Sequence, residues 1–127
     1  MSDRPRSNQA GDEPPEPLKV DVRRLASAPV VRIEGSASFA VADKLRSRLE
    51  KLAAEQAPLV VLDLTALDFI CSPGLGAIIS LHIKSRHHAG RIRLVNPQPA
   101  VLEILGTTRL TKLFPIFPNV EQALRQS

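Results

Sequence analysis

The chain has 127 residues, a formal net charge of +4, a single cysteine and no tryptophan or tyrosine. A chain of this length can fold as one domain without cross-links, and the lone thiol of Cys71 excludes an internal disulfide and suits a reducing cytoplasm, where we expect the protein to reside. No apolar stretch approaches the roughly 18 residues of a membrane helix and no signal-peptide core is present, so a membrane is not an expected partner. The phenylalanines are not interleaved with basic residues, so a nucleic acid is not an expected partner either.

Residues 1–17 are polar and rich in proline, with no large apolar side chain after Met1. Such a segment buries too little surface to offset its conformational entropy. We therefore expect a disordered tail over 1–17 and a single folded domain over 18–127.

Alternating apolar residues over 18–25 and 30–35 predict two strands joined as a hairpin, with Gly35 ending the second strand. Residues 38–56 then show the apolar period of an amphipathic helix, for which Ser38 is the candidate N-cap. The apolar stripe of this helix consists of Val41, Leu45, Leu49 and Leu52.

The rest of the chain alternates strands and helices. Residues 58–64 form a continuous apolar run that suits a strand buried on both faces. The elements expected after it are a helix from Pro73 to about His88, a strand at 91–95, a short helix at 99–106, a short edge strand at 112–117 and a helix capped by Asn119. This order predicts an α/β fold: a small mixed sheet of four or five strands, with a mostly parallel core and an antiparallel N-terminal hairpin, packed against about four helices. The side chains expected to be buried are Leu62, Leu64, Phe69, Ile78 and Ile79.

The segment DFICSPGLGAII, residues 68–79, follows the most buried strand, at the sheet edge where α/β proteins gather ligands. Ser72 followed by Pro73 matches the preferred start of a helix, with serine as N-cap and proline at the first helical position. The free amides and partial positive charge at a helix N-terminus would also stabilise a phosphoryl group on Ser72. These residues leave two interpretations open, a structural cap and a regulatory serine.

Catalytic interpretations of this turn have less support. A nucleophile elbow requires glycine two positions before the serine, where Ile70 stands, and a phosphatase-like loop requires arginine six positions after the cysteine, where Ala77 stands. His82 shares an apolar helix face, as a histidine at the edge of the core would, and no spacing of histidine, cysteine and acidic residues indicates a metal site. We expect neither a catalytic residue nor a cofactor, and a small thiol- or serine-dependent enzyme is the least favoured alternative.

A stripe of helix positions that begins beside Ser72 is a candidate docking surface for a partner. It combines small residues with one leucine on the expected outward side of the helix, a pattern that suits contact with another helix. The candidate partner-binding residues are Ser72, Pro73, Gly74, Ala77, Leu81 and Lys84.

Two stretches of the chain resemble the STAS domain, the fold of bacterial anti-sigma factor antagonists: VVLDLTALDFICSPGLGAIISL and GRIRLVNPQPAVLEILGTTRLTKLFPIFPNVEQAL. The resemblance covers about residues 18–124 and implies a small mixed sheet with helices packed against it. By position, Ser72 matches the serine that is phosphorylated in the family, and Gly74 and Leu75 match the glycine and leucine of the same motif. Cys71 replaces the aspartate of that motif, and Pro73 replaces its second serine or alanine.

The resemblance also implies a function. It implies a cytoplasmic protein–protein interaction module that regulates transcription by binding an anti-sigma factor, which in this family is also a serine kinase. Phosphorylation of Ser72 would then release the partner. The alternative within the family is a STAS domain without a phosphorylation switch, acting as a scaffold or as an accessory subunit of a transporter or signalling complex. We expect a monomer or a weak dimer.

Overall fold

The computed structural model describes residues 18–125, and the predicted tail over 1–17 and residues 126–127 lie outside the described part. The elements in chain order are β1 (Leu18–Leu25), β2 (Ala28–Ala37), the 3-10 helix η2 (Phe39–Val41), α1 (Ala42–Ala54), β3 (Leu59–Asp63), β4 (Leu67–Ile70), α2 (Ser72–Arg86), β5 (Arg91–Val95), α3 (Pro99–Thr107), the 3-10 helix η3 (Leu110–Lys112), β6 (Ile116–Phe117) and α4 (Val120–Arg125). The α/β class, the mixed sheet and the four α-helices of residues 18–125 confirm the predicted fold class.

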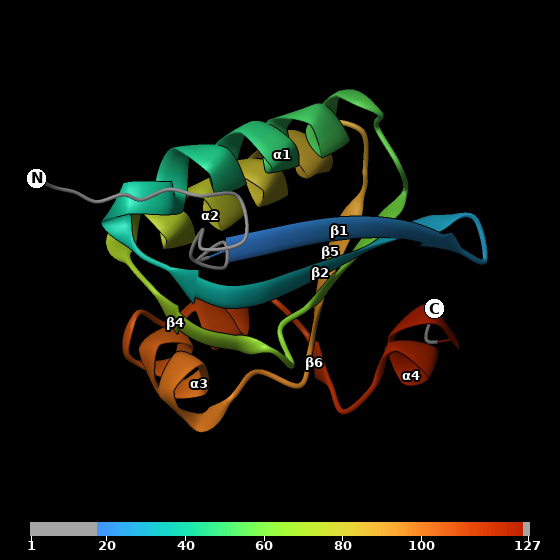
Figure 1. The fold of residues 1–127 in the computed structure, drawn as a ribbon. Coiled ribbons are helices and arrows are strands. Elements are labelled where there is room, and N and C mark those ends of the chain that lie inside the picture. Colours follow the sequence, from blue (N-terminus) through green and yellow to red (C-terminus); the bar gives the residue numbers. More distant parts are fainter. Residues whose placement is uncertain (1–17, 126–127) are drawn as a thin grey trace, which may run out of the picture.

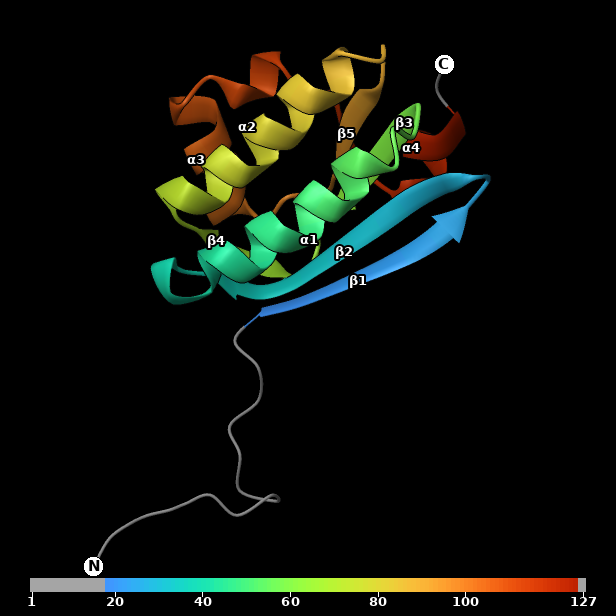
Figure 2. The same ribbon diagram turned by 90° about the horizontal axis from the view of Figure 1, so that it is seen from above.

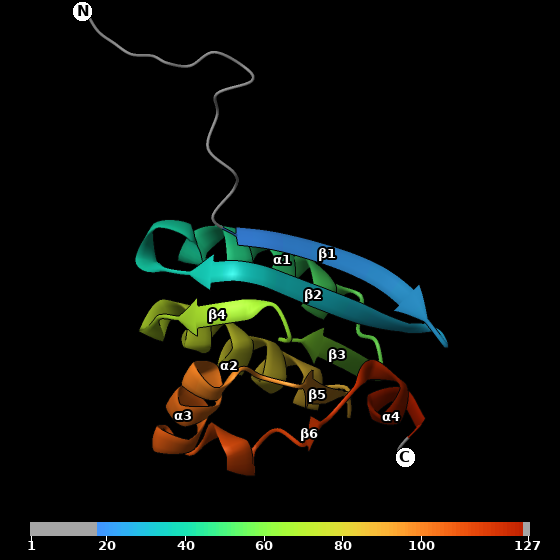
Figure 3. The same cartoon turned by 60° about the horizontal axis from the view of Figure 1, so that its bottom comes forward.

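The sheet has six strands in the order β1-β2-β3-β5-β6, and β4 pairs with β2 outside this path. All pairs are parallel except the β1–β2 hairpin. Helices α1 and α2 lie side by side over one face of the sheet, and α3 and α4 lie on the other side (Figures 1 and 2). The view from below shows α3 beside β4 and α4 beside β6 (Figure 3).

The two N-terminal strands form the predicted hairpin. β1 pairs antiparallel with β2 along its whole length, and the turn residues Ala26 and Ser27 have φ values of 52° and 67°. Two successive left-handed residues suit a type I′ turn, whose twist matches that of paired strands. The prediction that Gly35 ends the second strand is wrong. Gly35 has a φ of 106° and marks a bulge, after which β2 continues to Ala37.

Residues 67–70, for which neither a helix nor a strand was predicted, form β4. β2 pairs with β3 through Val30–Arg32 and, beyond the bulge, with β4 through Gly35–Ala37. β3 and β4 run in the same direction and pair one after the other with β2. The three residues between them therefore shift the chain sideways within the sheet and do not form a hairpin turn. The usual signals of a new strand are therefore absent from the sequence at this point.

Helix α1 begins later than predicted. Ser38 makes no side-chain capping bond; instead its carbonyl accepts from the Val41 N–H at 3.1 Å, which closes the single turn of η2 before α1 starts at Ala42. The predicted apolar stripe is confirmed for the α-helix itself, where Leu45, Leu49 and Leu52 are buried.

The C-terminal half follows the prediction closely. The chain reverses after α2 where expected, with Ala89 at a φ of 62° and the Gly90 N–H donating to the Ser85 carbonyl at 2.7 Å. β6 is the short edge strand predicted there, and the Asn119 side chain caps α4 by accepting from the Gln122 N–H at 2.9 Å.

The larger core lies between the sheet and the helices α1 and α2. Buried side chains of α3 and the side chain of Phe114 belong to the same core. Leu62, Leu64 and Ile78 are buried as predicted, whereas Ile79 is only half-buried. The predicted burial of Phe69 is wrong, since its side chain is 44% exposed. Within β4 the positions that fill the core are Leu67 and Ile70, and the two residues between them are exposed.

Replacing Leu62 by alanine should test the central position of β3. Leu62 is fully buried in the main core, so Leu62→Ala should lower the free energy of unfolding by about 2–5 kcal/mol through lost contacts and a residual cavity. Urea denaturation measures the change. Ile83→Ala, at a position 52% exposed on α2, is the control and should stay within about 1 kcal/mol of wild type. A similarly small effect of Leu62→Ala would contradict the fold.

Protonation of His82 should destabilise the protein. The ring lies edge-on to Phe114 at a centroid distance of 5.2 Å, as a core-edge histidine would, and partial burial together with the charge of Arg86 lowers the pKa of His82 below 6.5. As the pH falls through 6.5, the unfolded chain takes up its proton first, so stability is full above that pH and declines toward the folded-state pKa.

Urea denaturation at about pH 7.5 and about pH 5.5 measures this decline. We expect a smaller decline in His82→Gln than in wild type, and an unchanged one in His87→Gln, at an exposed position. Equal declines in wild type and His82→Gln would show that His82 does not contribute.

Candidate functional site

The candidate site is the junction between β4 and α2, at the carboxyl end of the strand. The Cys71 N–H donates to the Ala37 carbonyl at 2.8 Å, which extends the β2–β4 ladder by one residue. The Cys71 carbonyl accepts from the Leu75 N–H at 2.9 Å and so begins the helix. Cys71, extended at φ −86° and ψ 172°, is therefore the N-cap residue.

The predicted capping role of Ser72 is wrong by one position. Because the Cys71 peptide is held in extended form against Ala37, the helix already includes Ser72 and Pro73 as its first residues. Within the described residues no side chain caps this helix, so the Ser72 hydroxyl is not used for capping. Ser72 is exposed, Pro73 is half-buried, and the Cys71 thiol is buried at 3% exposure.

The predicted outward stripe of α2 in fact faces inward. Ala77 and Leu81 are each 2% exposed, and Gly74 is buried as well. α1 packs directly against this side of α2, and these three residues lie in the contact or beneath it. The prediction that they contact a partner therefore fails, since their side chains are not accessible. Of the candidate positions, Ser72 and Lys84 are exposed and Pro73 is partly so.

Two phenylalanines near Ser72 are exposed instead. Phe39 is 73% exposed in η2, directly after the end of β2, and Phe69 is 44% exposed on β4. The β2–β4 ladder brings both segments to the start of α2, because Ala37 pairs with Ile70 and accepts from Cys71. We call Phe39, Phe69 and Ser72 the serine surface.

The polar side chains near the junction form hydrogen bonds with one another and not with Ser72. The Ser36 hydroxyl donates to the Asp68 carboxylate at 2.7 Å, and the Asp63 carboxylate accepts from the Thr65 hydroxyl at 2.6 Å. Among residues 18–125 no group of three histidine, cysteine or acidic side chains could hold a metal ion. What the junction offers is an exposed hydroxyl at a helix start, with an exposed phenylalanine in each of the two segments that meet there, which is a surface suited to recognition by another protein.

No helix within residues 18–125 is both long and apolar enough to cross a membrane. The STAS domain family model matches residues 19–123, and the chain belongs to this family. A similar sequence is the anti-sigma F factor antagonist of Paenibacillus polymyxa, which is 26% identical over 110 residues that cover 86% of this chain and 94% of the relative.

Solved structures of anti-sigma factor antagonists have the same fold. The crystal structure of one from Mycobacterium paratuberculosis superposes with a TM-score of 0.79 at 27% identity, covering 87% of this chain and 94% of that one. The Bacillus cell fate determinant SpoIIAA in its phosphorylated form gives a TM-score of 0.66 at 18% identity, covering 84% and 96%. At that identity the second likeness concerns the fold alone.

Two glycines of α2 should respond in opposite ways to alanine. A Cβ at Gly74 would lie 2.8 Å from Cγ1 of Ile70, so Gly74→Ala should destabilise the protein by about 1–3 kcal/mol through overpacking. A Cβ at Gly76 would meet nothing within 4 Å, so Gly76→Ala should be neutral or stabilising by up to about 1 kcal/mol through helix propensity. Denaturant unfolding measures both, and a Gly74→Ala variant as stable as Gly76→Ala would contradict the close contact between α2 and β4.

Proposed function

We propose that this protein is an anti-sigma factor antagonist, a non-enzymatic cytoplasmic module that binds an anti-sigma factor through the serine surface. The observation that carries the proposal is the exposed Ser72 hydroxyl at the start of α2, left free by the capping role of Cys71. Two exposed phenylalanines beside it supply apolar area for a partner. The family membership and the anti-sigma factor antagonists among the similar proteins support the same function.

Phosphorylation of Ser72 by a kinase-type anti-sigma factor would release the partner. A phosphoserine carries about −1.5 to −2 charges, and burying it against Phe39 and Phe69 in an interface would cost its hydration. The helix start would stabilise the modified form in the free protein. Pro73 has no N–H and the Leu75 N–H donates to Cys71, so the amides left to face a phosphoryl group in this turn are those of Ser72 and Gly74.

Ser72 variants test the switch. The assay uses the purified chain with the kinase-type anti-sigma factor of the same organism and ATP, followed by intact-mass spectrometry and calorimetric titration. Wild type should gain one phosphoryl group and lose at least about tenfold in affinity, whereas Ser72→Ala should stay unmodified and bind. Ser47→Ala, on the exposed face of α1, is the control and should behave as wild type.

The possible outcomes separate the proposal from its alternative. Phosphorylation at another position, or on Ser72 without loss of affinity, would contradict the switch. Intact binding with an unmodified Ser72 would favour a STAS scaffold or an accessory subunit that binds without phosphorylation. One observation favours that alternative: a buried thiol, rather than an acidic side chain, precedes Ser72 and leaves no charge there to orient a kinase.

A further inference from the structure

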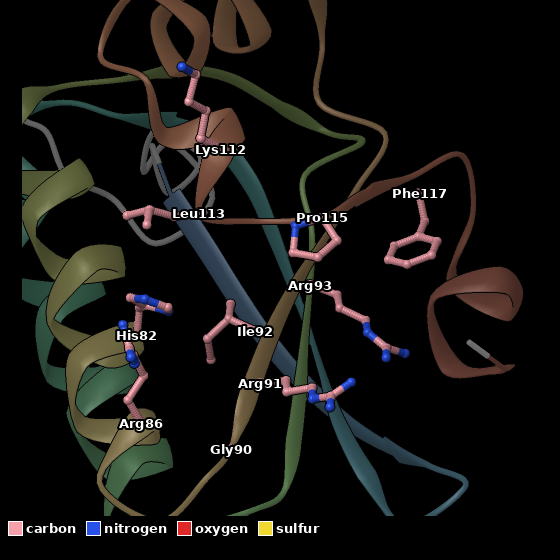
Figure 4. A pocket seen from close by; sticks show the side chains of 10 residues that line it. All are labelled: His82, Arg86, Gly90, Arg91, Ile92, Arg93, Lys112, Leu113, Pro115 and Phe117. Atoms are coloured by element: carbon pink, nitrogen blue, oxygen red, sulfur yellow. The ribbon is translucent and has the colours of Figure 1, made fainter. Parts of the chain in front are cut away.

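A cationic pocket lies at the other end of α2, around the edge of β5. Its volume of about 550 Å³ falls within the range of about 300–1,000 Å³ that ligand sites occupy. Its walls come from the last turns of α2, from β5 and from the segment between η3 and β6 (Figure 4). Ser72 is not among its lining residues, so the pocket is separate from the serine surface.

On the side of the pocket, β5 lacks a partner among the described strands at Ile92, a residue that lines the pocket and is 3% exposed. β6 has only two residues, which pair with Leu94 and Val95. The Leu94 N–H donates to the Pro115 carbonyl on the β6 side, and the Arg91 N–H donates to the Pro58 carbonyl on the β3 side. Since peptide groups alternate between the two sides of a strand, the N–H and C=O of Ile92 face the pocket, where within residues 18–125 no strand pairs with them.

Among residues 18–125, the pocket is lined by basic side chains and by no acidic ones. The basic residues are Arg86, Arg91, Arg93 and Lys112. Among residues 18–125, Arg86, Arg91 and Lys112 form no ion pair. Charges of one sign gathered in a concave site attract a partner of the opposite sign.

One arginine is held in place by the fold. The Arg93 guanidinium donates from Nη1 to the Ala123 carbonyl at 2.6 Å and lies 5.4 Å from the centre of the Phe117 ring. Arg93 is only 5% exposed. It gives the wall of the pocket a fixed positive charge, whereas the side chains of Arg86 and Arg91 are exposed and can move to meet a ligand.

The charges lie on both sides of the open strand. Arg86 comes from α2 on one side of β5, and Arg91 and Arg93 extend from β5 toward α4 on the other (Figure 4). A strand added beside β5 would direct successive side chains alternately to these two sides. Adjacent acidic residues in such a strand would therefore each meet an arginine.

We propose that the open edge of β5 binds an extended acidic segment of a partner protein, which adds to the sheet as a strand in line with β6. The Ile92 edge offers both a donor and an acceptor, which a peptide backbone satisfies together and a small anion does not. The apolar side chains of Leu113 and Phe117 would cover the added strand. This site does not depend on the proposed role of Ser72.

Peptide binding tests the proposal. The probe is a fluorescein-labelled octapeptide with a central valine pair flanked by aspartate and glutamate, titrated against the full chain by fluorescence anisotropy. Three changes should each weaken binding at least about tenfold: replacing the acids by asparagine and glutamine, N-methylating the central valines, and the double variant Arg86→Gln with Arg91→Gln. The Ile92 amide should become protected from hydrogen exchange when the peptide binds.

A matched control removes the same charge elsewhere. Arg23→Gln with Lys51→Gln, at exposed positions on β1 and α1, should bind the acidic peptide as wild type does. No binding of the acidic peptide, or binding indifferent to N-methylation, would overturn the added strand. Equal competition by inorganic phosphate or by a short oligothymidylate at matched ionic strength would overturn it too, in favour of a general anion site or a nucleic-acid site.

Discussion

The position of the candidate site depends on one strand that changes partners. β2 pairs with β3 through its first half and with β4 through its last three residues, and Gly35 makes the shift possible by adopting a φ of 106° at the bulge. The ladder ends in the hydrogen bond from Cys71 to Ala37, which fixes where α2 begins. The pairing of β4 with the second half of β2 therefore determines both the exposure of Ser72 and which residues lie near it.

Helix α2 contributes to two surfaces because one side of it is buried along its length and both its ends are exposed. Gly74, Ala77 and Leu81 pack inward, where the absence of a Cβ at Gly74 admits Ile70 of β4. The helix is therefore anchored between α1 and the sheet, and its first turn presents Ser72. Its last turns, with Arg86, line the cationic pocket beside β5. A rigid helix joining two exposed ends allows two partners to bind at separate places.

Much of the fold could be predicted from periodicity and end signals. The hairpin, the buried strand, the edge strand at Phe117 and the Asn119 cap all have local causes that can be read from neighbouring residues. β4 could not be predicted in this way, because its pairing depends on a bulge in a distant strand. The exposure of Phe69 could not be predicted from strand alternation either, because alternation places Phe69 on the same face as the buried Leu67.

At the candidate site, the start of a helix could be predicted, but not which residues it exposes. The Ser-Pro pair correctly indicated a helix start, yet the hydrogen bond of Cys71 to Ala37 moves the cap back by one residue. Periodicity alone does not tell which side of a helix between two layers faces solvent, because α2 contacts both α1 and the sheet. The inward direction of Ala77 and Leu81 therefore required the structure, as did the exposure of Phe39.

The most direct test of the account is to map the contact surface in the complex with the anti-sigma factor. Hydrogen exchange and amide shift perturbation, recorded on the labelled chain with and without the unlabelled partner, would locate it. The account predicts that the largest changes fall on 36–41 and 67–75, around the serine surface. Changes confined to the last turns of α2 and the edge of β5, with Ser72 and its neighbours unaffected, would contradict it.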